Sequence, residues 1–228
     1  MTEPISRDTL VDTLVGRLRA DVLSERYPPG AMLPPERELA AAYGVTRTSL
    51  KHALVRLAQA GLVETRHGVG TRVRDYSRHA GPDLLPMLVA HAGPDWLGEI
   101  FEVRREIGAL VAARAATGAD DDVRRRLRDL LAEVAGAADA DAAQLAECEL
   151  HRVLAAATGN RVYGLLVNSL LNAYEEVRGL FRAPFSDPKA AADRLAPLVA
   201  TVCAGDPAAA HAAAEEYLAL TGQLMLGE

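Results

Sequence analysis

The sequence predicts a mostly α-helical protein, with a small N-terminal part that ends in one β-hairpin and a larger part built of helices. The chain has 228 residues, of which 50% are hydrophobic and only 4% aromatic. It is rich in Ala, the residue that favours an α-helix most, especially after residue 83. Gly and Pro interrupt the chain at intervals that suit helices. β-prone runs around a Gly-rich turn occur at residues 62–74, and this pattern predicts the hairpin.

The first predicted helix spans residues 9–25. Its apolar residues recur at every fourth position and form one stripe. They are Leu10, Leu14, Leu18 and Val22. The Tyr-Pro-Pro-Gly sequence at residues 27–30 ends this helix, because Pro cannot continue a helix and Gly permits a tight turn.

The second predicted helix starts at Pro34 and Pro35, since Pro suits the first helical turn. It ends at Gly44, which can adopt the left-handed cap conformation. Thr46 is a good N-cap for a third helix, which runs to about Gly61. This helix directs three leucines inward, namely Leu50, Leu54 and Leu57. Two short helices joined by a Gly-containing turn form a helix-turn-helix.

The hairpin at residues 62–74 completes the N-terminal part as a wing. We therefore predict a winged helix-turn-helix DNA-binding domain over residues 1–75 and a linker over residues 76–82. Residues 83–228 are predicted to form an all-helical bundle of about seven helices, because breaks recur and no strand-like alternation appears. Such a bundle can enclose a ligand cavity between facing helices. The breaks lie near 93–94, 117–120, 136–139, 159–160, 184–188 and 205–207.

The charge distribution separates the two parts. The net charge is −6 over the whole chain, but residues 1–78 hold 12 Lys or Arg against 9 Asp or Glu. Residues 79–228 hold 13 against 22, so the acidic excess lies in the helical part. A local basic patch matters more to a polyanion than the sum over the chain. The N-terminal part therefore suits a DNA partner.

A recognition helix presents its first residues to base edges in the major groove. Arg47 can donate two parallel hydrogen bonds to guanine O6 and N7, and Lys51 suits a phosphate. Thr46 serves as a DNA contact or only as the helix cap. The predicted DNA-binding residues are Arg37, Thr46, Arg47, Thr48, Ser49, Lys51, Arg66, His67 and Gly68.

The wing residues have an alternative interpretation. Arg66 and His67 can enter the minor groove or contact its phosphates. Alternatively, Arg66, Arg72 and Arg74 only keep the hairpin soluble, and His67 is a plain turn residue.

Four segments resemble the GntR family of bacterial regulators: residues 28–30, 33–39, 44–50 and 57–63. The resemblance implies a homodimer that binds a short palindromic operator with a GT…AC core. It also implies DNA contacts at the predicted positions of the recognition helix and wing tip. Lys51 departs from the arginine expected there, which puts a bidentate contact at that position in doubt.

The helical part resembles the FadR branch of that family, in residues 103–105 and 147–170. Many members of this branch sense a carboxylate through a metal held by one Asp and three His. The matching positions are Glu147, His151, Leu195 and Tyr217. Leu cannot ligate a metal and Tyr rarely does, so we expect no bound metal and treat a metal-dependent carboxylate sensor as the alternative function.

Other members of the branch lack the metal and bind a long-chain acyl-CoA, which the resemblance makes the expected effector. Carried over by position, the effector-binding residues are Arg104, Tyr174, Tyr217, Thr221 and Gly222. Arg pairs with phosphate, Tyr offers an apolar body with a hydroxyl, and Gly allows close approach. Met225 stands where tryptophan is expected. The alternative is that the two tyrosines are ordinary core residues and Arg104 forms a structural ion pair.

The motifs that are missing from the sequence argue against an enzyme and against a membrane protein. No phosphate-binding Gly loop, nucleophile elbow or zinc-protease motif occurs, so we expect neither an enzyme nor a cofactor. No apolar run approaches the roughly 20 residues of a membrane helix, and residues 1–4 do not resemble a signal peptide. Cys148 and Cys203 lack metal-like spacing and suit buried thiols in a reducing cytoplasm.

Overall fold

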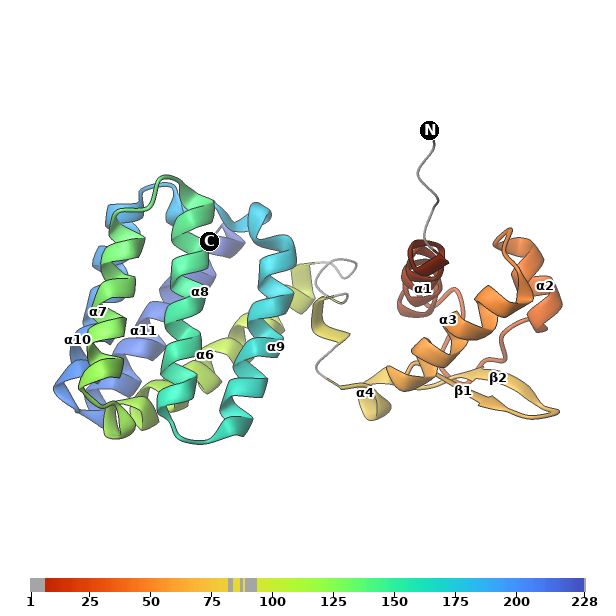
Figure 1. Cartoon of the computed structure of the whole chain (residues 1–228), viewed down its shortest axis with the longest axis horizontal. Coiled ribbons are helices and arrows are strands. Elements are labelled where there is room, and N and C mark those ends of the chain that lie inside the picture. Colours follow the sequence, from red (N-terminus) through yellow and green to blue (C-terminus); the bar gives the residue numbers. More distant parts are fainter. Residues whose placement is uncertain (1–6, 82–83, 87, 89–93, 228) are drawn as a thin grey trace. The chain divides into compact units, whose positions relative to one another are not determined.

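The computed structural model describes residues 7–81, 84–86, 88 and 94–227. The chain divides into two compact units, Met1–Leu84 and Leu85–Glu228. The first holds helices α1 to α4 and a hairpin, and the second holds helices (Figure 1). The predicted fold class is thereby confirmed. None of the described helices is both long enough and apolar enough to cross a membrane.

The N-terminal unit follows the predicted order of elements. Its main elements are α1 (Arg7–Leu23), α2 (Glu36–Ala42), α3 (Arg47–Gln59), β1 (Val63–Arg66) and β2 (Gly70–Val73). Helix α1 packs against α3. The predicted stripe on α1 is wrong at Leu10, which is 45% exposed, while Val11 and Val15 join the buried face. Four residues exceed one 3.6-residue turn, so a row of every fourth residue drifts around the helix.

The turns of this unit use the residues that the sequence indicates, with small shifts. Pro35 is the N-cap of α2 rather than part of its first turn, and its carbonyl accepts the Leu39 N–H at 3.0 Å. Gly44 adopts the left-handed conformation, with φ of 65°. Thr46 caps α3, since its Oγ1 accepts the Ser49 N–H at 3.1 Å. Helix α3 ends at Gln59, and Gly61 is required because a Cβ there would lie 2.2 Å from the His79 carbonyl oxygen.

The wing is an antiparallel hairpin that pairs Val63 with Val73 and Arg66 with Gly70. Met32 forms an isolated antiparallel bridge with Arg72, which ties the segment before α2 to the hairpin. Within the expected linker, residues Tyr76–His79 form one helical turn, α4, capped by Asp75. Pro82, at the end of that expected linker, lies outside the described residues.

The second unit contains six α-helices within its described residues. They are α6 (Pro94–Gly118), α7 (Asp121–Ala135), α8 (Ala140–Ala157), α9 (Arg161–Val177), α10 (Pro188–Ala204) and α11 (Pro207–Leu226). Two short 3₁₀ turns, Arg178–Phe181 and Ala183–Phe185, join α9 to α10. The breaks near 117–120, 136–139, 159–160 and 205–207 lie where Gly, Pro and Asp predicted them, whereas α9 already ends at Val177, before the break expected at 184–188. Most of the segment expected before residue 93 lies outside the described residues.

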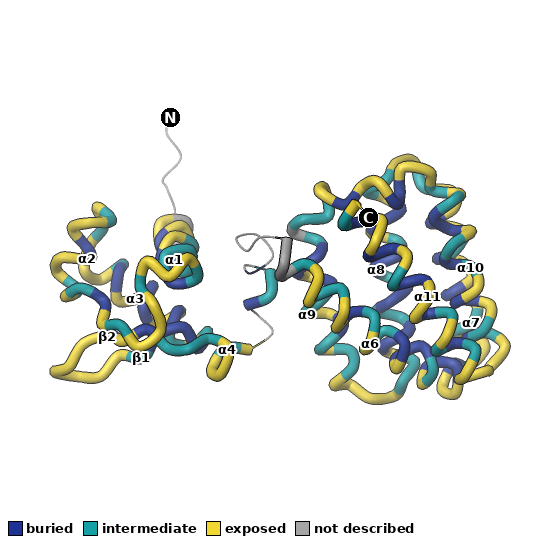
Figure 2. The backbone as a smooth tube through the Cα atoms, turned by 180° about the vertical axis from the view of Figure 1, so that it is seen from behind, coloured by how far each residue is buried: buried dark blue, intermediate teal, exposed yellow. Residues whose placement is uncertain are grey.

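Helices α6 and α11 pack closely against each other, and α6 also contacts α8, α9 and α10. Buried residues therefore line the inner faces of these helices, and exposed residues lie outside (Figure 2). Gly108 makes the approach of α6 to α11 possible, because a Cβ there would lie 2.3 Å from the Leu218 Cδ1.

Candidate functional sites

The start of α3 presents a polar surface to solvent. Thr46, Arg47, Thr48 and Lys51 are exposed, and Ser49 is half-buried. The Ser49 hydroxyl lies 2.9 Å from Thr46 Oγ1, so these two side chains take part in the helix cap. Leu50 and Leu54 point into the core of the unit, which leaves Arg47 and Lys51 free to face a partner.

Glu36 forms long, exposed ion pairs with Arg47 and Lys51. Its Oε2 lies 3.8 Å from Arg47 Nη2 and 3.9 Å from Lys51 Nζ, and the cationic side chains stay 64% and 60% exposed. Exposed ion pairs of this kind contribute little and are screened by salt. A phosphate or a base edge can therefore displace Glu36 from either cation.

A groove runs between α2, the start of α3 and the wing. Five of the nine predicted DNA-binding residues line it: Arg37, Arg47, Arg66, His67 and Gly68. Lys51 lines a neighbouring groove with Val55 and Thr65. Arg66 pairs with Glu64 at 3.1 Å, and Arg72 is exposed on the hairpin.

The interior of the helical unit contains a charged centre at Glu147, which is fully buried. One carboxylate oxygen, Oε1, accepts a hydrogen bond from Arg104 Nη2 at 2.7 Å and another from the Tyr217 hydroxyl at 3.0 Å. His151 Nε2 lies 3.0 Å from the same oxygen. Helices α6, α8 and α11 thus supply three groups to one oxygen.

The electrostatics of this centre keep both charges. Burial tends to raise the pKa of Glu147, but the charge of Arg104 and the hydrogen bonds from His151 and Tyr217 lower it to about 2. Burial opposes the charge of Arg104, yet Glu147 holds the pKa of that guanidinium above its ordinary value. Burial and the nearby carboxylate raise the pKa of Tyr217, which therefore remains a neutral phenol. Glu147 and Arg104 therefore form a buried ion pair, and His151 lies against the same carboxylate oxygen.

Two buried polar atoms of the centre, Arg104 Nη1 and Glu147 Oε2, have no hydrogen-bond partner among the described residues. Thr221 lies against the Tyr217 hydroxyl, whose pKa its hydroxyl group lowers. An unpaired buried donor or acceptor costs about 1–3 kcal/mol. The two unpaired atoms are therefore natural contact points for a polar group of a ligand.

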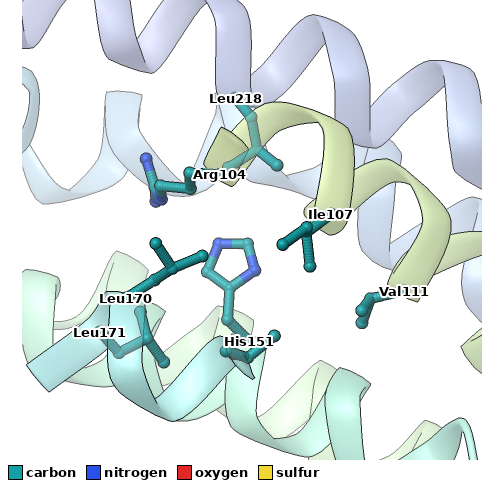
Figure 3. Close-up of a pocket in the computed structure, with 9 residues that line it drawn as sticks. Arg104, Ile107, Val111, His151, Leu170, Leu171 and Leu218 are labelled. Atoms are coloured by element: carbon teal, nitrogen blue, oxygen red, sulfur yellow. The ribbon is translucent and has the colours of Figure 1, made fainter. Parts of the chain in front are cut away.

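A cavity of about 30 Å³ adjoins the centre, between α6, α8, α9 and α11. Figure 3 shows the His151 ring between Leu170 and Ile107, with Arg104 nearby. The polar lining residues are Arg104 and His151, and the apolar ones are Ile107, Gly108, Val111, Val167, Leu170, Leu171 and Leu218. This volume suits about one or two water molecules, so the cavity has no room for a larger ligand.

The predicted effector residues lie around the centre in different roles. Arg104 lines the cavity, whereas Tyr217 contacts Glu147 behind it. The Tyr174 hydroxyl accepts a hydrogen bond from Gln144 Nε2 at 2.7 Å, and its ring centroid lies 6.0 Å from the Arg104 guanidinium. Thr221 and Gly222 are buried, and a Cβ on Gly222 would lie 3.6 Å from Phe101 Cβ, which is ordinary contact.

The residues present do not fit a divalent metal. Glu147 and His151 supply two donors, but the Arg104 guanidinium already lies against the carboxylate. Leu195 is fully buried and has no ligating atom, and the raised pKa of Tyr217 makes it a poor ligand. Within the described ranges, no group of three or more His, Cys, Asp or Glu side chains is placed to hold a metal ion. Both cysteines are free thiols, Cys148 buried and Cys203 half-buried.

Three residues of this centre, Glu147, Gln144 and Gly108, are not predicted in these roles from the sequence. The sequence indicates Glu147 only as a metal-ligand position, although its i, i+4 spacing from His151 on an Ala-rich helix signals a polar pair on one face. Gln144 is fully buried and holds Tyr174, and Gly108 lines the cavity. No sequence signal identifies Gly108, because its role depends on the partner helix.

Two family models match the chain, one in each of the two structural units. Residues 10–73 match the family described as "Bacterial regulatory proteins, gntR family". Residues 99–220 match the family described as "FCD domain". The first match contains the helix-turn-helix and the wing, and the second contains the Glu147 centre.

Several known proteins resemble the chain. The HTH-type transcriptional regulator Rv0494 of Mycobacterium tuberculosis is 37% identical over 227 residues, which cover 96% of this chain and 94% of that protein. The fatty acid metabolism regulator protein of Edwardsiella ictaluri is 35% identical over 173 residues, covering 74% and 70%. Among solved structures, Lar, which controls the expression of the Listeria monocytogenes agr system, shares the fold with a TM-score of 0.61 at 16% identity, covering 99% of this chain and 98% of that one.

Proposed function

The chain belongs to the GntR family of bacterial DNA-binding transcription regulators with an FCD effector-binding domain, and we propose that it binds a palindromic operator as a homodimer and releases it when a long-chain acyl-CoA enters the helical unit. Proteins of these families are transcription regulators and not enzymes. The observation that carries the effector proposal is the apolar cavity beside Arg104, together with similarity to fatty acid metabolism regulators.

The DNA-binding proposal rests on the exposed start of α3 and the groove beside the wing. Arg47 and Lys51 are exposed there, which supports a contact of Arg47 with a guanine edge and of Lys51 with a phosphate. Arg37, Arg66 and His67 line the same groove as Arg47, so one duplex can engage α3 and the wing together. Thr46, Thr48, Ser49 and Gly68 border these contacts.

The dimer proposal follows from symmetry and from an exposed apolar surface. A palindromic operator matches a two-fold symmetric protein. Helices α6 and α9 pack against each other and carry exposed apolar side chains. These side chains are Val103, Leu110, Val162 and Leu165. We call them the α6/α9 surface.

The charges beside the α6/α9 surface suit an antiparallel pair of identical copies. Exposed Glu99, Glu102 and Glu106 lie in the first half of α6. Exposed Arg114 lies near its end, 5.4 Å from the ring centroid of Tyr163 in the first turn of α9. An antiparallel copy would set the acidic end of one α6 against the basic end of the other. Opposite charges at the rim favour this register over a parallel one.

The effector proposal implies a conformational change. A cavity of about 30 Å³ cannot hold an acyl chain, so α6, α9 and α11 must separate when the ligand binds. A ligand shifts the DNA-binding equilibrium only by its differential affinity for the two states. Coupling of about 1–3 kcal/mol, a 5–150-fold loss of operator affinity, is typical.

A titration of operator release tests the proposal. Labelled GT…AC palindromic DNA bound to the purified protein is titrated with acyl-CoAs of increasing chain length, and anisotropy is followed. We expect release by long-chain acyl-CoAs and none by CoA alone. Retention of the operator at every chain length would refute the effector proposal and leave the DNA-binding function in place.

A further inference from the structure

We infer that Glu36 is a specificity-determining residue, whose carboxylate competes with DNA phosphates for Arg47 and Lys51 and so weakens binding to arbitrary DNA more than binding to the operator. The inference rests on the proposed function in one respect, namely that Arg47 and Lys51 contact DNA. It goes further by naming an acidic residue that separates operator binding from binding to any duplex.

The first step is the position of Glu36 beside both cations. Its Oε2 lies 3.8 Å from Arg47 Nη2 and 3.9 Å from Lys51 Nζ. Glu36 begins α2, whereas the two cations lie four positions apart on α3 and therefore on the same face of that helix. One carboxylate thus balances the two cations that are proposed to contact DNA.

The second step is the charge of the two grooves, both of which Glu36 lines. It is the one acidic residue among the described residues that line them. The other lining residues that carry or can carry charge are Arg37, Arg47, Lys51, Arg66 and His67. Arg66 is paired on the hairpin with Glu64 at 3.1 Å, and the Glu36 side chain is less exposed than that of Arg47 or Lys51. The carboxylate therefore stays near the protein surface while the longer cationic side chains can extend toward DNA.

The third step is the difference between a phosphate and a base edge. A phosphate that binds Arg47 or Lys51 takes the cation from Glu36 and brings a second anion close to the carboxylate, which is repulsive. A guanine edge is neutral and uses two of the five N–H donors of an arginine. Arg47 can therefore contact guanine and still balance Glu36. Glu36 disfavours the contacts that every duplex offers more than the contact that only the operator offers.

The test compares two duplexes of equal length, the GT…AC palindrome and a random sequence. Full-length wild type and Glu36→Gln are titrated by anisotropy over a range of salt concentrations. We expect Glu36→Gln to bind random DNA about 5–10-fold more tightly at about 0.1 M salt, the electrostatic worth of about one more neutralised phosphate. Operator affinity should rise less than about 3-fold, because Arg47 contacts a neutral base there. The plot of log affinity for random DNA against log salt should steepen by about one unit.

The matched control is Glu38→Gln, which removes the same charge from an exposed residue in the same turn of α2. It should gain much less affinity for random DNA, because only the long-range repulsion changes. In a second arm, Glu36→Gln is added to the variant that combines Arg47→Ala with Lys51→Gln. The gain should disappear in this background, since the cations that Glu36 engages are gone. Equal gains on the two duplexes, an equal gain in Glu38→Gln or a gain that persists without the two cations would each overturn the inference.

The outcomes separate this inference from the proposed function. If wild type binds both duplexes alike while Glu36→Gln gains more affinity for random DNA than Glu38→Gln does, the operator proposal fails and the competition between Glu36 and phosphates stands. If wild type prefers the operator while Glu36→Gln, shown to be folded by circular dichroism, gains no affinity for random DNA, the role of Glu36 fails and the proposed function stands.

Discussion

Arg104 of α6 and Glu147 of α8 form a buried ion pair with 2.7 Å between Nη2 and Oε1. The pair lies in the interior of the helical unit. Arg104 already contacts the Glu147 carboxylate, which would have to bind the metal in a metal-dependent carboxylate sensor. Tyr217 joins the pair from α11. Movement of α6, α8 or α11 relative to the others would therefore change these contacts.

Low pH should reduce the folding stability of the protein because Glu147 becomes protonated. The pKa of this carboxyl is lowered from 4.5 to about 2 in the folded state. Its contribution is therefore fully present above pH 4.5 and is lost as the pH falls toward 2, about 3 kcal/mol in all by linkage. Denaturant unfolding of wild type and Glu147→Gln from pH 7 to pH 2 measures this. The advantage of wild type should shrink below pH 4.5, and a constant advantage would contradict the assignment.

Specific DNA binding should depend on Arg47. We expect Arg47→Ala to cost about 1–3 kcal/mol of operator binding, the usual worth of a bidentate base contact. Binding to random DNA should fall less. A gel-shift titration measures both, with Arg125→Ala as control because that arginine is equally exposed but lies on α7. Unchanged operator affinity in Arg47→Ala would show that α3 is not the recognition helix.

Self-association should depend on the α6/α9 surface. Leu165 is 68% exposed, so Leu165→Arg should fold normally and yet place a desolvated charge in the proposed interface. Light scattering should give a dimer mass for wild type and a larger monomer fraction for this variant. Leu145→Arg, on the exposed side of α8, is the control. If Leu165→Arg dimerises as well as wild type, the dimer interface does not lie at the α6/α9 surface.

Metal should be absent from the purified protein. The two candidate donors, Glu147 and His151, are too few for a stable site, and Arg104 already contacts the carboxylate. Elemental analysis should find no stoichiometric zinc, nickel or manganese, and a chelator should leave the melting temperature unchanged. A stoichiometric metal that is lost from His151→Ala would revive the carboxylate-sensor alternative.

Local signals were enough to predict most of the N-terminal unit. Gly44 and Thr46 end and start helices through their own backbone and side-chain chemistry, so the sequence alone indicates them. Leu10 is wrongly predicted to be buried, because a row of every fourth residue rotates around a helix that has 3.6 residues per turn. The Arg104–Glu147 pair and the role of Gly108 could not be predicted, since each joins helices far apart in the sequence and depends on tertiary packing.

Reciprocal linkage tests the central claim most directly. If acyl-CoA binding weakens operator binding, operator DNA must weaken acyl-CoA binding by the same factor. Calorimetric titration of a long-chain acyl-CoA into the protein, with and without saturating operator, measures both sides of that relation. We expect the operator complex to bind acyl-CoA about 5–150-fold more weakly than the free protein. Equal affinity in the two titrations would contradict it.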